Sequence, residues 1–220
     1  MFQKNNRKSK WKDNYSVINE QFKNIRTGID FSGINQKKQV FLVTSPESGT
    51  GKSTVAAHLA ATYAQKGEKT LLIDADMRKP TLHKRFSKNL NGGLSNIITG
   101  GVYWEDGLQT VRLDDCNFSI LTSGSIPPNP NDLLSSSQMT ELLDALKECF
   151  DVIILDTPPV TIVSDALVLG ELVDGMILVC RYNRTLKEKA VQANNKLKFS
   201  KAKLLGVIFN GTENSEEYYY

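Results

Sequence analysis

Residues 45–54 have the sequence SPESGTGKST, in which two glycines and a lysine stand among hydroxyl side chains. Gly49 and Gly51 allow a tight loop whose backbone N–H groups turn inward toward an anion. A helix that begins at the end of the loop would point its free N–H groups and its positive dipole end at the same anion. Lys52 can reach phosphate oxygens, and the Ser53 hydroxyl can bind magnesium. The segment therefore predicts a phosphate-binding loop.

This loop is a variant of the eight-residue phosphate-loop pattern, because Pro46 stands where the first glycine is usual. The match is therefore G-x-G-K-S-T, and the alternative is an ordinary glycine-rich turn before a helix. An apolar run before the loop and an alanine-rich run after it give the strand–loop–helix context that a phosphate loop requires. The expected nucleotide contacts are Ser48, Gly49, Thr50, Gly51, Lys52, Ser53 and Thr54.

Three aspartates directly follow apolar runs: Asp74 and Asp76 come after LLI, and Asp156 comes after VIIL. In an open parallel sheet, ligands bind at the carboxyl ends of the strands, so we expect these carboxylates to converge near the phosphate loop. Mg²⁺ keeps several waters and uses few carboxylates together with phosphate oxygens. One aspartate alone is more often a cap or a turn residue. Three beside a phosphate loop favour a magnesium-dependent site in which one carboxylate accepts a proton from a nucleophile.

Strands and helices alternate along the chain. The expected strands are mostly continuous apolar runs, typical of parallel strands that are covered on both faces, and they span 39–44, 70–74, 118–122, 151–156, 175–180 and 204–210. Helices are expected at 15–28, 51–65, 138–149 and 186–199. With right-handed crossovers, this order predicts an α/β fold: a three-layer sandwich with a mostly parallel central sheet of the P-loop NTPase type.

The composition narrows the classes of protein. The chain has 220 residues, 40% hydrophobic and 23% charged, which suits one domain with a sizeable core and short appendages. A net charge of +3 is too small to indicate nucleic acid as a partner. Three cysteines far apart favour neither disulfides nor a metal site, and no apolar run is long enough to cross a bilayer. We therefore expect a cytoplasmic protein.

The two ends differ from the middle. Residues 1–14 are basic and are expected to form a flexible arm, either solvated or resting on anionic lipid. Residues 15–30 are expected to form an N-terminal helix and a possible oligomerisation element, and residues 31–211 the catalytic domain. Residues 212–220 end in consecutive tyrosines behind acids and are expected to be a disordered tail.

Several motifs resemble those of the bacterial tyrosine kinases. DADMR fits the family's D-x-D-x-R motif, and ILDTPP fits its strand-end aspartate motif. RKPTLH, GGLSNIITG, LTSGSIPPNPNDLL and VSDALVL are similar as well, so that the resemblance covers roughly residues 15–220. It implies a protein-tyrosine kinase that uses ATP and Mg²⁺ and regulates the synthesis and export of capsular or extracellular polysaccharide.

The resemblance also implies roles for individual residues. Lys52, Ser53 and Thr54 would hold the phosphates and the metal, and Asp74 would activate the tyrosine hydroxyl. Ser53, Asp76 and Asp156 would form the metal site. Arg78 would either steady the transferring oxygens or pair with a nearby acid. Asn210, at the end of the last expected strand, would contact adenine or serve only as a turn residue.

Autophosphorylation by a neighbouring subunit is expected at Tyr218, Tyr219 and Tyr220. The family assembles as a ring through an N-terminal E-x-x-R-x-x-R helix, to which Glu20, Lys23 and Arg26 correspond, with lysine in place of the first arginine. The resemblance further implies a transmembrane activator, similar to the polysaccharide co-polymerases, whose cytoplasmic tail docks on the kinase and keeps it at the inner face of the plasma membrane. A cognate tyrosine phosphatase and protein substrates of the polysaccharide pathway would be the other partners.

Two other functions compete with this one. A ParA/MinD-like ATPase switch that dimerises on ATP usually carries a lysine near the start of its phosphate loop, where this chain has Glu47. A nucleotide-sensing module without turnover would need damaged motifs, whereas Lys52, Asp74, Asp76 and Asp156 are all present. The tyrosine tail favours the kinase.

Overall fold

The computed structural model describes residues 6–32, 38–113 and 115–212. Within these residues, seven strands form one sheet in the order β3-β4-β2-β5-β1-β6-β7. The strands are β1 (Val40–Thr44), β2 (Thr70–Asp74), β3 (Gln109–Arg112), β4 (Asn117–Leu121), β5 (Val152–Asp156), β6 (Gly175–Arg181) and β7 (Leu204–Asn210). All pairs are parallel except β3 with β4. This confirms the predicted mostly parallel α/β sheet.

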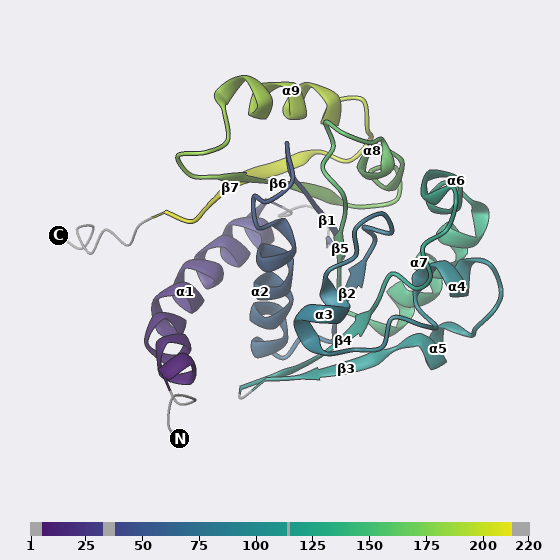
Figure 1. The fold of residues 1–220 in the computed structure, drawn as a ribbon, viewed down its shortest axis with the longest axis horizontal. Helices are drawn as coiled ribbons and strands as arrows, with labels where there is room; N and C mark the ends of the chain where they lie inside the picture. The colour runs from purple at the N-terminus through teal and green to yellow at the C-terminus, as the bar shows by residue number, and fades with distance from the viewer. Residues whose placement is uncertain (1–5, 33–37, 114, 213–220) are drawn as a thin grey trace.

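Helices cover both faces of the sheet, as Figure 1 shows. They are α1 (Asn6–Phe31), α2 (Lys52–Gln65), α3 (Leu82–Phe86), α4 (Leu94–Ile98), α5 (Trp104–Gly107), α6 (Pro130–Leu134), α7 (Ser137–Cys149), α8 (Asp165–Leu169) and α9 (Lys187–Leu197). The side chains of β1, β2 and β5 are buried at every position. They feed two hydrophobic clusters, one beneath α1, α2 and α3 and the other beneath α4, α7, α8 and α9. The three-layer sandwich follows from these two cores.

One strand and the N-terminal helix differ from the sequence prediction, apart from the short helices that it did not contain. β3 was not expected, because only Val111 of its four residues is buried and its pattern has no apolar run. α1 begins at Asn6, so residues 6–14, which the sequence analysis assigns to a flexible arm, are helical. No proline or glycine interrupts the chain between Asn6 and Gly28, which explains the longer helix. Residues 1–5 and 213–220 lie outside the described residues.

Helix α1 is fastened to α2 by polar and aromatic contacts. Arg26 donates from Nη1 to the Thr62 carbonyl oxygen at 2.9 Å, and the Tyr63 hydroxyl donates to Asp30 Oδ1 at 3.0 Å. Of the three residues matching the E-x-x-R-x-x-R motif, Lys23 pairs with Glu20 on the helix surface at 3.1 Å, whereas Arg26 is committed to α2. None of the described helices is long and apolar enough to span a bilayer.

The stack of His58 on Phe22 makes the docking of α1 sensitive to pH. The ring centroids are 4.9 Å apart, and burial together with the Arg85 charge lowers the pKa of His58 from 6.5 to about 4. Between these values only the unfolded chain binds the proton, so this group lowers the free energy of unfolding as the pH falls from 6.5 to 4, by at most about 1.4 kcal/mol per pH unit. Urea unfolding at pH 7 and pH 5 should show a smaller loss for His58→Phe, which keeps the stack. Equal losses in both proteins would contradict this role.

Candidate active site

The phosphate loop joins β1 to α2 and has the backbone that an anion site needs. Gly49 (φ 81°) and Gly51 (φ 89°) are both left-handed, and no side chain of the described residues caps the first turn of α2. The free N–H groups at the start of this 14-residue helix therefore remain available to a phosphate. Asn210, at the end of β7, donates from Nδ2 to the Thr50 carbonyl oxygen at 2.8 Å and so holds the loop from its outer side.

A substitution at Gly51 measures how much nucleotide binding depends on the left-handed backbone of the loop. A Cβ at Gly51 would meet Asn210 Nδ2 closer than van der Waals contact, and a side chain at a left-handed φ costs about 1–2 kcal/mol. Gly51→Ala should therefore weaken nucleotide binding about tenfold in isothermal titration.

Gly67→Ala is the matched control for this variant, because Gly67 has φ 93°, lies at the end of α2, and a Cβ there would meet no atom of the described part of the chain within 4 Å. Its nucleotide affinity should not change. Gly51→Ala combined with Asn210→Ala separates the collision from the backbone strain. Unchanged affinity in Gly51→Ala would show that the loop geometry is not required.

Lys52 lies among the acids that the sequence predicted near it. Its Nζ is 3.0 Å from Asp76 Oδ2, 3.3 Å from Asp156 Oδ1 and 3.4 Å from Ser53 Oγ. Burial alone would lower the pKa of Lys52, but the charges of Asp156 and Asp76 outweigh it and the pKa is raised. The lysine is therefore cationic, and the expected convergence of the phosphate loop with the carboxyl ends of β2 and β5 is observed.

Asp156 has an oxygen that no described residue satisfies. Its carboxylate is fully buried, and Oδ2 has no hydrogen-bond partner, nor does the buried Thr50 hydroxyl. Burial raises the pKa of Asp156, against the opposing charge of Lys52. Ser53, Asp76 and Asp156 offer only oxygen donors, which suits Mg²⁺ together with phosphate oxygens and water. No group of three or more His, Cys, Asp or Glu in the described part of the chain is arranged to hold a metal alone.

Asp74 lies beneath the pocket and does not form part of its wall. It is fully buried, and Oδ2 accepts the backbone N–H groups of Thr81 (3.1 Å) and Leu82 (3.0 Å) at the start of α3. Oδ1 accepts the N–H of Asp76 at 3.3 Å. Burial and the Asp156 charge raise the pKa of Asp74 to about 7. The carboxylate therefore both holds the segment that follows β2 and titrates near neutral pH.

Arg78 pairs with an acid, which was one of the two roles expected for it. Its Nε and Nη2 donate to the two oxygens of Asp165 at 2.9 and 3.0 Å. Asp165 was not predicted as a site residue, although it lies in the VSDALVL segment. Arg85 was also missed. Its Nη1 donates to the Thr54 hydroxyl at 2.9 Å, so a second arginine adjoins the phosphate loop.

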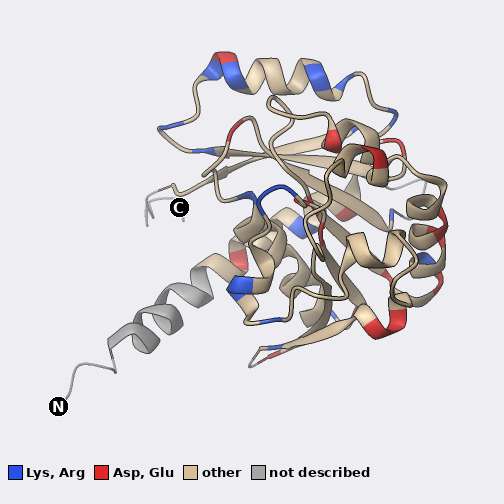
Figure 2. Ribbon diagram, turned by 45° about the vertical axis from the view of Figure 1, so that its right-hand side comes forward, with Lys and Arg blue, Asp and Glu red and all other residues tan. Residues whose placement is uncertain are grey.

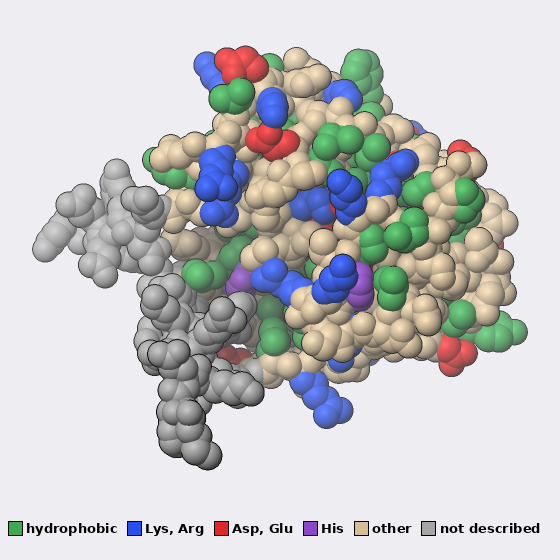
Figure 3. All heavy atoms as spheres, in the orientation of Figure 1, with side chains coloured by type: hydrophobic (Ala, Val, Ile, Leu, Met, Phe, Trp, Pro, Cys, Tyr) green, Lys and Arg blue, Asp and Glu red, His purple; other side chains and the backbone are tan. Residues whose placement is uncertain are grey.

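These groups surround a cavity of about 440 Å³. The wall comprises Ser48, Gly49, Gly51, Lys52, Ser53, Thr54, Asp76, Arg78, Lys79, Thr81, Arg85, Pro158, Pro159, Ile162 and Val163. Figure 2 shows Lys and Arg on loops near the middle of the molecule, and Figure 3 shows Lys and Arg side chains across the middle of one face. The cavity is therefore positively charged at its mouth, as an anionic substrate requires.

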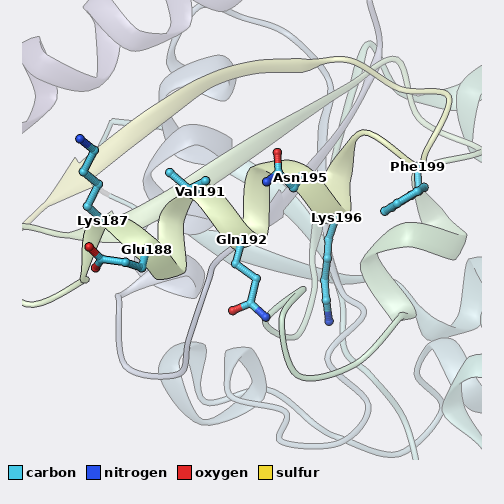
Figure 4. Close-up of a pocket in the computed structure, with 7 residues that line it drawn as sticks. All are labelled: Lys187, Glu188, Val191, Gln192, Asn195, Lys196 and Phe199. Atoms are coloured by element: carbon cyan, nitrogen blue, oxygen red, sulfur yellow. The ribbon is translucent and has the colours of Figure 1, made fainter.

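Helix α9 adjoins both loops of this cavity. Lys189 pairs with Glu47 of the phosphate loop at 2.5 Å, and this bond lowers the pKa of Glu47. Lys196 donates to the Thr161 carbonyl oxygen at 2.9 Å, and Figure 4 shows its side chain extending away from the helix. The Thr161 hydroxyl in turn donates to the carbonyl of Pro46, the residue that replaces the usual glycine. A second cavity of about 570 Å³ lies along α9 and contains none of the predicted site residues (Figure 4).

Fold and site together define a nucleotide-binding domain of the P-loop class, and comparison with known proteins agrees. Residues 41–219 match the family model described as the CobQ/CobB/MinD/ParA nucleotide binding domain. The chain is 42% identical to tyrosine-protein kinase YwqD of Bacillus subtilis (strain 168) over 208 residues, 93% of this chain and 87% of the relative. It is 39% identical to the putative tyrosine-protein kinase CapB of Staphylococcus aureus, covering 93% and 90%.

Among solved structures, the chimerical protein CapA2B2 superposes with a TM-score of 0.84 and 37% identity, covering 89% of this chain and 85% of the other. The chain therefore belongs to the bacterial tyrosine kinases, within the CobQ/CobB/MinD/ParA nucleotide-binding family. This confirms the resemblance that the motifs indicated.

Proposed function

We propose that the protein transfers the γ-phosphoryl group of ATP to tyrosines of its own C-terminal cluster, Tyr218, Tyr219 and Tyr220, with Mg²⁺ as the metal. The observation that supports this best is the meeting of Lys52, Asp76 and Asp156 at the phosphate loop, where Asp156 keeps a buried oxygen without a partner. Such an oxygen suits a metal-bound water or a metal ion. Membership of the tyrosine-kinase family supports tyrosine as the acceptor.

The phosphate loop would bind the nucleotide. Backbone N–H groups of residues 48–54 surround the β- and γ-phosphates, and Lys52 leaves Asp76 and Asp156 to bind the phosphate oxygens. Ser53, Asp76 and Asp156 would hold Mg²⁺, which would neutralise charge on the β- and γ-phosphates when bound. Asn210 uses Nδ2 on the loop, and its Oδ1 is left to accept from the adenine amino group.

The transfer itself is a displacement at phosphorus. The tyrosine Oη attacks the γ-phosphorus, the bond from that phosphorus to the β,γ-bridging oxygen breaks, and ADP leaves. The hydroxyl proton passes to Asp74, whose pKa of about 7 suits a general base at neutral pH. Asp76 lines the cavity, and its backbone N–H donates to Asp74 Oδ1 at 3.3 Å.

The wider role follows from the family resemblance. We propose that phosphorylation regulates the synthesis and export of capsular or extracellular polysaccharide, with a transmembrane activator that docks on the protein through its cytoplasmic tail at the inner face of the plasma membrane. A ring of subunits would bring one tail to a neighbour's site, and a cognate phosphatase would reverse the modification. Each added phosphate brings about −1.5 to −2 charges next to Glu216 and Glu217, so modified tails should repel one another.

The test is to incubate the purified protein with ATP, Mg²⁺ and the activator tail and to map phosphate by mass spectrometry. Phosphotyrosine is expected at residues 218–220 and nowhere in a variant with all three tyrosines changed to Phe. The Phe variant should still hydrolyse ATP slowly, since its phosphate loop is intact. ATP hydrolysis without any phosphotyrosine in the intact protein would contradict the kinase and favour the ATPase switch.

A further inference from the structure

Asp165 is a buried carboxylate that the proposed chemistry has not used. It stands at the start of α8, its side chain is fully buried, and its partners come from two other parts of the chain. Arg78 binds both carboxylate oxygens, and Asn131 of α6 donates from Nδ2 to Oδ1 at 3.3 Å and to the Ser164 hydroxyl at 3.1 Å. A carboxylate removed from water needs such partners to remain charged.

The pair with Asp165 occupies only some of the N–H donors of the Arg78 guanidinium. Arg78 donates from Nε and from Nη2, which is the paired geometry that a planar guanidinium makes with a carboxylate. Nη1 and the second hydrogen of Nη2 have no partner among the described residues, and the side chain remains 39% exposed in the wall of the cavity. One edge of the group is therefore fixed and the other edge is free for a ligand.

We propose that Asp165 is a positioning residue for phosphoryl transfer: it orients Arg78 so that the free guanidinium edge contacts the transferring phosphoryl group. This rests on the proposed function for the identity of that group. Because the bonds from Asp165 fix both the position and the plane of the guanidinium, Arg78 enters the reaction without further ordering, and the charge that develops on the phosphoryl oxygens meets preorganised donors. Asn131 contributes indirectly, because it donates a hydrogen bond to the Asp165 carboxylate and so helps to hold it in place.

The distinction from a merely structural ion pair lies in which kinetic constant changes. A group that contacts the phosphoryl mainly during transfer affects kcat, whereas a residue that supports the fold affects stability and nucleotide binding. A lysine cannot replace the arginine here, because it carries one compact charge and cannot bind a carboxylate with one edge and a phosphate with the other. Arg78→Lys therefore preserves charge while removing the proposed geometry.

The experiment measures ATP turnover and phosphotyrosine formation by the full-length protein with Asp165→Asn, Arg78→Lys, Arg78→Gln and the double variant Arg78→Gln/Asp165→Asn. We expect kcat to fall roughly 100- to 1000-fold in each, which is the effect of losing one oriented donor, with KM for ATP changed less than threefold. The double variant should be no slower than Arg78→Gln alone, since both changes remove the same interaction. Glu171→Gln, which breaks the exposed pair of Glu171 with Lys201, is the control and should leave kcat unchanged.

Three outcomes would overturn the proposal: wild-type kcat in Asp165→Asn, wild-type kcat in Arg78→Lys, or multiplied losses in the double variant. Thermal unfolding of each variant identifies a folding defect. If Asp165→Asn does not fold, Arg78→Lys and Arg78→Gln decide, because their exposed side chain is changed without emptying the core. Failure of the proposed function is distinguishable, since a wild-type protein that hydrolyses ATP but forms no phosphotyrosine still reports the same comparison through ATP turnover.

Discussion

Lys52→Met is expected to reduce phosphotyrosine formation at least 100- to 1000-fold, roughly the effect of removing a preorganised donor from developing charge. Methionine has nearly the shape of the lysine stem but no cation for the β- and γ-phosphates. It also leaves Asp76 and the buried Asp156 without the charge that faces them at 3.0 and 3.3 Å. Breaking a buried pair in this way costs about 3–5 kcal/mol. Phosphotyrosine mass spectrometry and urea unfolding measure the two effects.

Lys201→Met is the matched control. It removes the same charge from an exposed pair in which the lysine side chain is 80% exposed, so neither activity nor stability should change by more than the small contribution of a surface pair. A Lys52→Met protein that retains more than a tenth of the wild-type rate would show that the phosphates are held without this lysine.

Asp74→Asn is expected to reduce kcat by about 10²- to 10⁴-fold, the usual contribution of a general base. In the wild type, kcat should rise with pH up to about 7, because the carboxylate must lose its proton before it can accept one from tyrosine, and burial raises its pKa to about 7. Below that value the rate should fall about tenfold per pH unit. In Asp74→Asn, the remaining rate should lack this limb. A pH series of initial rates measures both.

The pH dependence of stability runs opposite to that of kcat: the contribution of Asp74 to the free energy of unfolding falls as the pH rises. A folded pKa raised from 3.8 to about 7 means that the folded state binds the proton more tightly, so the contribution of Asp74 is full below pH 3.8 and is lost as the pH rises through 7. The free energy of unfolding of Asp74→Asn should therefore improve relative to the wild type between pH 4 and pH 7. Asp144→Asn, at a surface pair with Lys147, should show neither effect. If kcat of Asp74→Asn still falls below about pH 7 as it does in the wild type, the general base is another group.

The strands that were predicted correctly are those whose burial makes them continuous apolar runs. β2 and β7 have the predicted bounds, and β1, β5 and β6 differ by one residue at an end. β3 was missed because an edge strand with one buried side chain has no apolar pattern to detect. The helices α3, α4, α5, α6 and α8 were missed because segments of four or five residues are too short to show helical periodicity.

The site residues that could be predicted from the sequence are those at the ends of apolar strands. Lys52 and Asp76 follow strands and Asp156 ends one, and the rule that parallel strands end at one edge is sufficient to bring them together. Asp165 and Arg85 lie on short helices, whose approach to the phosphate loop depends on packing. The depth of Asp74 was also unpredictable, because Asp74 and Asp76 lie on the same strand end and only the turn into α3 decides which of them faces the cavity.

Helix α9 is bonded to two loops of the site, the phosphate loop and the loop that follows Asp156, and so links their positions. Lys189 holds the phosphate loop through Glu47, and Lys196 holds the loop that follows Asp156 through Thr161. These lysines are two turns apart on one helix, so a tilt of α9 displaces both loops at the same time. A displacement of α9 would therefore move the phosphate loop and the loop that follows Asp156 together.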